Sequence, residues 1–119
     1  VALRHKALPI VGDTWGKFRR ELKLFEAFEI HTRMLGWDDK WSFVEHRFVS
    51  RGRVVGVVLI RGLFRSPKGT VAPGEFAREL GLAEQSPALP HWLSAWSQSC
   101  DDMSLQLRGE EASAVQAPR

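Results

Sequence analysis

The chain has 119 residues, of which 44% are hydrophobic and 26% are charged, a composition typical of one soluble globular domain rather than a multidomain or disordered protein. Cys100 is the single cysteine, which excludes an internal disulfide framework. It fits a reducing compartment, so we expect a cytoplasmic protein. No hydrophobic run approaches the roughly 20 residues that a membrane helix needs, so we expect no membrane partner.

The positive charge is concentrated in the first part of the sequence. Residues 1–68 hold 14 Lys and Arg against 7 Asp and Glu, whereas residues 69–119 hold 3 against 7. A basic half of this kind fits nucleic acid, an anionic surface or a phosphate-bearing small molecule. The basic residues alternate with apolar ones and form no cluster of about five or more, which favours a solvated sheet face and argues against nucleic acid.

Alternating apolar and polar residues from Trp15 to Phe64 predict three or four antiparallel strands. In one of them Phe28, Ile30, Thr32 and Met34 share a face, as a half-buried strand requires. The segment 54–64 is apolar on both faces and is predicted to be a central strand. The predicted strands are 13–24, 28–34, 41–50 and 54–64, with turns at 36–40, 50–53 and 66–69.

Two short helices are predicted after the strands. Pro73 suits the first turn of a helix and Gly81 suits its end. The segment 86–90 is a stiff linker, and Pro90 opens a second helix that continues to about Cys100. Residues 109–119 are rich in Glu, Ala, Ser and Gln and are predicted to be a disordered tail, which leaves 1–108 as the single domain.

The sequence contains no glycine-rich phosphate loop of the Walker or Rossmann type. Its four histidines are far apart and accompany no cysteine pair, so no structural zinc site is predicted. We therefore expect neither a cofactor nor a bound metal.

Asp38 and His46 are the weak catalytic candidates. Asp38 belongs to an Asp-Asp pair at a predicted turn, where carboxylates ordinarily cap backbone N–H groups; the alternative is a carboxylate beside a bound electrophile. His46 shares a strand face with Val44 and Phe48, which favours a packed, hydrogen-bonded histidine over a catalytic one. Glu45 points to the opposite face and cannot pair with it.

The run from Phe25 to Phe48 resembles the central strands of the hotdog-fold thioesterase-like superfamily, which is related to the 4-hydroxybenzoyl-CoA thioesterase and acyl-CoA thioesterase families. The most specific piece is Leu35-Gly-Trp-Asp-Asp-Lys40. The similarity covers about residues 8 to 98 and continues through 61–65, 71–73 and 86–92.

The resemblance implies an α+β fold with a hotdog-like antiparallel sheet of about four strands, followed by two short C-terminal helices. Such proteins wrap the sheet around a long central helix and dimerise through sheet edges, with acyl-CoA at the interface. Their catalytic carboxylate lies in an Asp-x-Asp-x-x-x-His-x-Asn-like motif that this sequence lacks. We therefore expect a domain truncated at its N-terminus, without the first strand and most of the central helix.

Two functions follow from these expectations. The first is an acyl-CoA thioesterase-like protein, a hydrolase that is catalytically incomplete as this chain and that contacts coenzyme A phosphates through Arg61, Arg65 and Lys68. The alternative is a non-catalytic domain that binds an acyl or other small apolar ligand or serves oligomerisation. In either case we expect an acyl-CoA-like partner and a homodimer or higher homo-oligomer.

Overall fold

The computed structural model of the chain describes residues 8–79, 81 and 85–116. It divides into two units, Val1–Ala88 and Leu89–Arg119, joined at the predicted proline-rich linker. The single domain over 1–108 stays a prediction, and the second helix lies in the second of these units. The elements in chain order are β1 (Leu8–Phe18), β2 (Glu29–Trp37), β3 (Ser42–Ser50), β4 (Arg53–Ser66), β5 (Gly69–Val71), α1 (Pro73–Glu79) and α2 (His91–Gln116).

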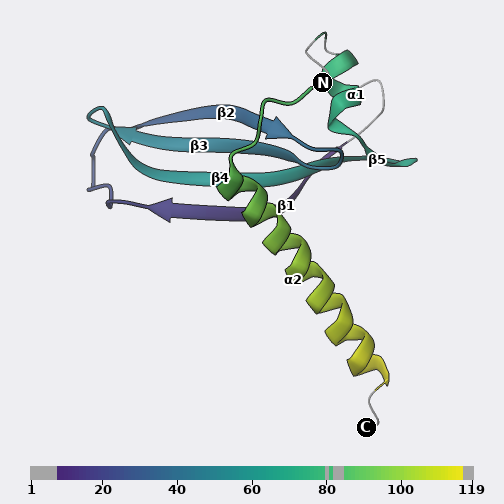
Figure 1. The fold of residues 1–119 in the computed structure, drawn as a ribbon. Coiled ribbons are helices and arrows are strands. Elements are labelled where there is room, and N and C mark those ends of the chain that lie inside the picture. Colours follow the sequence, from purple (N-terminus) through teal and green to yellow (C-terminus); the bar gives the residue numbers. More distant parts are fainter. Residues whose placement is uncertain (1–7, 80, 82–84, 117–119) are drawn as a thin grey trace. The chain divides into compact units, whose positions relative to one another are not determined.

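The first unit is built on one antiparallel sheet. Its long strands lie side by side in the order β1, β4, β3, β2, and the short β5 pairs with β4 (Figure 1). The predicted antiparallel sheet followed by helices is confirmed. The period-two alternation that predicted β2, β3 and β4 thus indicates the strands and also which residues share a face of the sheet.

The first strand begins earlier than predicted. It was expected within 13–24, but β1 starts at Leu8 and ends at Phe18. Its course is set by pairing with β4 along its whole length, and the backbone N–H groups of Arg19 and Arg20 then both donate to the Val55 carbonyl. Because β1 is an edge strand, it tolerates Pro9, which hid the strand from sequence analysis.

The sheet has two unlike faces. The closed face carries Phe43, Leu59 and Leu63, all buried. The open face carries apolar side chains that are between 46% and 77% exposed in the described chain: Phe18, Phe28, Ile30 and Met34. The register places these side chains together, since Ile30 opposes Phe48 and Phe18 opposes Gly56. One face therefore forms a core, and the other presents an apolar surface.

A buried arginine organises the closed face. Arg61 is 1% exposed, and its Nε donates to the Asp13 carboxylate at 2.8 Å. Its guanidinium also lies 3.9 Å from the centre of the Trp41 ring. Asp13 reaches Arg61 because a β-bulge at Gly12 shifts the register of β1 against β4. A buried charge is stable only when it is paired, so this cluster joins β1, β4 and the β2–β3 turn.

Helix α1 forms where it was predicted. Pro73 lies at its first position, Glu75 is in its first turn, and Gly81 follows its end with a φ of 75°. Phe76 packs on Val71 and on Phe64, with the Phe64 and Phe76 ring centroids 4.4 Å apart. This contact attaches the helix to β4 and β5.

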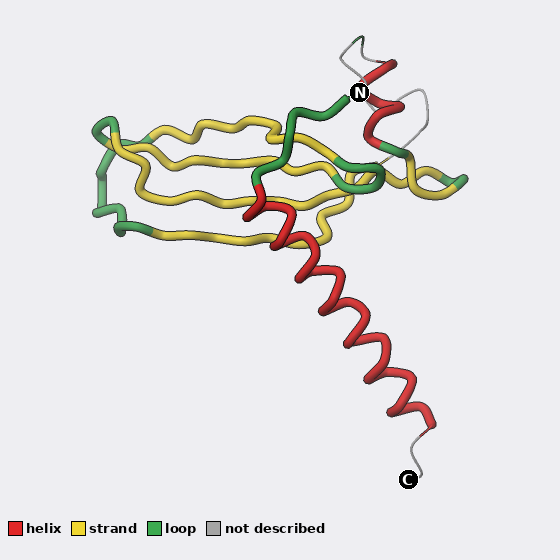
Figure 2. The backbone as a smooth tube through the Cα atoms, viewed as in Figure 1, coloured by secondary structure: helices red, strands yellow, loops and turns green. Residues whose placement is uncertain are grey.

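Helix α2 is much longer than predicted. It runs for 26 residues as one uninterrupted coil (Figure 2), so residues 109–116, expected in a disordered tail, are helical. The rest of that tail, 117–119, lies outside the described residues. Ala, Glu and Gln are good helix formers, and side-chain hydrogen bonds from Gln98 to Asp102 and from Gln106 to Glu110 span successive turns.

We predict that Gly12→Ala destabilises the first unit. A Cβ at this position would lie 2.6 Å from the Trp41 ring, which Arg61 holds in place. The expected loss is about 1–3 kcal/mol in the free energy of unfolding, measured by urea denaturation. The matched control is Gly109→Ala, where a Cβ meets nothing within 4 Å and helix propensity predicts a gain of about 1 kcal/mol. Equal effects of the two substitutions would contradict this account.

Candidate functional site

An open groove of about 520 Å³ lies at one end of the open face. Phe18 from β1, Phe48 from β3 and Gly56 from β4 form its apolar part, and the connection after β1 adds Arg19, Arg20, Glu21 and Leu22. Gly56 has no side chain, so the Phe18 ring can lie directly against its backbone. A Cβ at Gly56 would be 3.5 Å from this ring. The groove thus combines an apolar floor with basic residues at its rim, a combination common in small-molecule sites.

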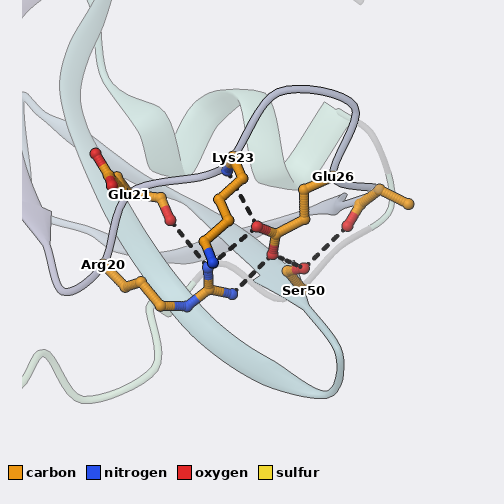
Figure 3. A network of polar contacts seen from close by, with 6 residues as sticks. Arg20, Glu21, Lys23, Glu26 and Ser50 are labelled. Carbon is orange, nitrogen blue, oxygen red and sulfur yellow. Dashed lines mark hydrogen bonds and ion pairs between the residues drawn. The ribbon is translucent and has the colours of Figure 1, made fainter.

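The rim is held by a network around Glu26 (Figure 3). Both terminal nitrogens of Arg20 donate to the Glu26 carboxylate, at 3.2 and 2.8 Å. The backbone N–H of Lys23 and the hydroxyl of Ser50 also donate to it, and the Ser50 hydroxyl contacts the Ala27 carbonyl. The β1–β2 connection is thereby tied to the end of β3, which fixes the groove wall.

This network changes the acidity of Glu26. The hydrogen bond from Arg20 has the largest effect and holds the pKa of Glu26 well below its usual value. The bonds from Ser50 and from the Lys23 backbone lower this pKa further. A carboxylate that accepts several hydrogen bonds favours its charged form. Arg20 is therefore committed to the rim rather than available to a ligand.

We predict that the Glu26 network makes stability depend on acid pH. A pKa lowered by folding stabilises the protein above the unfolded-state pKa of about 4.3, and this contribution is lost as the pH falls toward the folded-state pKa. The free energy of unfolding should therefore decrease below about pH 5, and less steeply in Glu26→Gln. Urea denaturation across this range measures both slopes. Glu21→Gln is the control, because Glu21 contributes its backbone carbonyl to the network, and it should keep the wild-type slope.

His46 lies in the middle of the open face. It opposes Thr32 in the register, and the Thr32 hydroxyl and His46 Nδ1 are hydrogen-bonded at 2.7 Å. No described carboxylate contacts its ring, since the neighbouring Glu45 lies on the closed face. His46 is therefore placed as a packed histidine with a hydroxyl partner.

Asp38 is engaged by the turn between β2 and β3. Its Oδ1 accepts the backbone N–H groups of Lys40 and Trp41, at 2.8 and 2.6 Å. This turn does not bring Asp38 to His46, because His46 is four residues, about 13 Å, along the strand from Ser42, which closes the turn. The two catalytic candidates do not form one site.

The three proposed coenzyme contacts are also separated by the structure. Arg61 is enclosed on the closed face by Asp13 and Trp41, so it is not available to a phosphate in solvent, which corrects the expectation for this residue. Arg65 and Lys68 are exposed around the β4–β5 hairpin. The sequence could not distinguish the buried Arg61 from the two exposed basic residues, because Asp13 and Trp41, which enclose Arg61, are far from it along the chain.

One polar cluster was missed by sequence analysis. On the closed face, Arg33 of β2 and Arg47 of β3 both donate through Nε to the same oxygen of Glu45, each at 2.8 Å. They line a hollow of about 220 Å³ together with His31 and Thr32. The alternation of Glu45 and Arg47 was visible in the sequence, but the pairing of Arg33 with Glu45 depends on strand register.

Among residues 8–79, 81 and 85–116, no three His, Cys, Asp or Glu side chains are grouped so as to hold a metal ion. In the same part of the chain, no helix has both the length and the apolar character that crossing a membrane requires.

Known proteins resemble this chain in sequence and in fold. The family model described as "Thioesterase-like superfamily" matches residues 1–97. Protein THEM6 of Danio rerio is 35% identical over 91 residues, covering 74% of this chain and 45% of that protein. Protein THEM6 of Xenopus laevis is 36% identical over 97 residues, covering 79% and 45%. Thioesterase poxG of Penicillium oxalicum is 30% identical over 101 residues, covering 65% and 33%.

A solved structure supports the fold. The BH1999 gentisyl-coenzyme A thioesterase superposes with a TM-score of 0.51 at 17% identity, covering 63% of this chain and 61% of that one. At this identity the match concerns the fold alone. The chain spans less than half the length of the curated relatives named above.

Proposed function

Since the chain belongs to the thioesterase-like superfamily, we propose that it takes part in binding an acyl-CoA, with the acyl group lying in the groove of the open face. The observation that carries this proposal is the groove itself, which has an apolar floor of Phe18, Phe48 and Gly56. Burying one aromatic-sized apolar contact contributes about 1.5–3 kcal/mol, enough for an acyl chain to bind at micromolar concentrations when several contacts form.

Hydrolysis of the thioester needs a group that attacks its carbonyl carbon or activates a water molecule to do so. The strand positions facing the open side in the register include Thr32, His46 and apolar residues, but no Asp or Glu. Glu21 lines the groove but belongs to the connection after β1 rather than to the open strands. The carboxylate of Glu26, in the same connection, is held by Arg20 and Ser50. We therefore propose that the attacking carboxylate comes from outside the described residues.

Coenzyme A also carries phosphates that basic residues bind. Arg65 and Lys68 stay our proposed contacts for them, since both are exposed around one hairpin and each offers a charged donor. The alternative function, an acyl-binding or oligomerisation domain without catalysis, is favoured by the same absence of an acid on the open strands. The two functions differ in whether thiol is released.

We predict that this chain binds acyl-CoA without releasing its thiol. Phe18→Ser should weaken binding about tenfold, because it removes an aromatic ring from the apolar floor of the groove. Phe25→Ser is the matched control, since Phe25 is 95% exposed in the β1–β2 connection, is not among the groove residues, and should leave affinity unchanged. Calorimetry measures affinity, and a thiol reagent measures turnover.

The outcomes separate the alternatives. Thiol release that appears only in a version containing any upstream coding sequence would support a thioesterase, whereas binding without release in both versions would favour the non-catalytic domain. Turnover by the 119-residue chain alone would contradict the prediction that this chain binds acyl-CoA without releasing its thiol. Failure of wild-type protein to bind any acyl-CoA would refute the proposed use of the groove.

We also propose that two copies associate through β2. This strand ends the sheet order, so one of its sides has no strand partner within the described residues. An unpaired edge is a template for a second strand, and an isologous pairing of two β2 edges would extend the sheet.

We predict that sedimentation equilibrium at micromolar concentration gives the mass of two or more chains. Ile30→Lys and Met34→Lys add charge on the open face without removing backbone pairing groups, so association through the edge should survive these substitutions. Loss of association in both variants would instead indicate pairing through the open face, and a wild-type monomer would contradict association altogether.

A further inference from the structure

The Arg33, Glu45 and Arg47 cluster has the geometry of an anion site. Glu45 is the buried member, with a side chain 3% exposed, whereas the side chains of Arg33 and Arg47 are 61% and 42% exposed. Both arginines donate through Nε to the same carboxylate oxygen, at 2.8 Å. A single buried oxygen thus anchors two guanidinium groups that reach toward solvent.

Anchoring through Nε leaves the terminal nitrogens of each guanidinium unused. Neither Arg33 nor Arg47 makes another hydrogen bond or ion pair within the part of the chain that the structure describes. The planar fork of terminal N–H groups is the part of arginine that binds an anion in a bidentate manner. Two such forks therefore flank the hollow of about 220 Å³.

The local charge also favours an anion. Two guanidinium groups share one carboxylate, so the cluster carries a net positive charge, and His31 lines the same hollow. One opposing group is Glu29, which lies 3.7 Å from His31 Nε2 and is exposed. Because Glu45 already fixes the arginines, an incoming anion orders less of either side chain than it would with unanchored arginines.

The number of forks selects the class of anion. A carboxylate forms the parallel, two-bond arrangement with one arginine fork, using both of its oxygens. A phosphoryl group has three or more oxygens and up to two negative charges, so it can accept from both forks at once. We propose that Arg33 and Arg47, positioned by Glu45, form a binding site for a phosphoryl group.

This site lies on the closed face, opposite the groove proposed for the acyl group. The register places Arg33 beside Glu45 on that face, whereas His46, between Glu45 and Arg47 on β3, lies on the open side. The inference does not depend on the proposed function, because it uses neither the groove residues nor Arg65 and Lys68, and its first test uses inorganic phosphate and pyrophosphate.

The test is calorimetric titration with sodium phosphate and pyrophosphate at low ionic strength, with sodium chloride as the reference. Wild-type protein should bind pyrophosphate saturably. Arg33→Gln and Arg47→Gln should each weaken binding about tenfold or more, since each removes charged hydrogen bonds. Arg33→Lys should weaken it several-fold, because the charge is kept but the fork is lost.

Arg53→Gln is the matched control. Arg53 is an exposed arginine at the start of β4, and its replacement changes the net charge by the same amount. It should leave pyrophosphate affinity within about twofold. Equal weakening by Arg53→Gln, or retained affinity in both Arg33→Gln and Arg47→Gln, would overturn the site, as would no saturable binding to wild-type protein. Thermal unfolding confirms that each variant is folded.

A further titration distinguishes the source of the phosphoryl group. Free coenzyme A, without an acyl chain, is compared with pyrophosphate in wild-type protein and in the groove variant Phe18→Ser. Tighter binding of coenzyme A that is lost in Arg33→Gln and kept in Phe18→Ser would assign the site to a nucleotide phosphate. Equal affinities for coenzyme A and pyrophosphate would assign it to a free anion.

Discussion

The pairing of Arg61 with Asp13 is the constraint on which the sheet and its groove depend. A guanidinium that is 1% exposed must be paired, and Asp13 pairs with it at 2.8 Å after the bulge at Gly12. A shift of β1 by one residue would separate these charges and reverse every side chain of that strand. Phe18 would then leave the open face, and the groove would lose the aromatic part of its floor beside Gly56.

The sheet separates two kinds of chemistry because neighbouring residues of a strand point to opposite faces. On β3, Glu45 and Arg47 face the closed side, whereas His46 and Phe48 face the open side. Charged groups on the closed side are held by one another, as Glu45 is by two arginines. The open side keeps an apolar surface with the His46–Thr32 pair at its centre. One strand therefore contributes to both the proposed acyl and the proposed phosphoryl site.

The sequence predicted the features that depend on local pattern and missed those that depend on pairing. The alternation within β2, β3 and β4 and the Pro73 and Gly81 signals of α1 were sufficient to locate these elements. β1 was misplaced because Pro9 and Gly12 obscure its alternation, and its position comes from β4. The length of α2 was missed because Ala, Glu and Gln residues are as typical of an exposed helix as of a disordered segment. The groove and the two-arginine cluster were missed because their residues come from different strands. Only the pairing between strands brings these residues together, and the pattern of one strand does not reveal it.

The arginines show why a basic residue on a strand does not by itself indicate a ligand. Arg61 and Arg33 both donate through Nε to a carboxylate at 2.8 Å, so the pairing alone does not distinguish them. The difference lies in their surroundings, since Trp41 lies over the guanidinium of Arg61 and the side chain of Arg33 is 61% exposed. A stacked, buried guanidinium stabilises the sheet, whereas an anchored and exposed one presents donors to solvent. Whether a strand arginine can bind a ligand therefore depends on whether the fold encloses its terminal N–H groups or leaves them facing solvent.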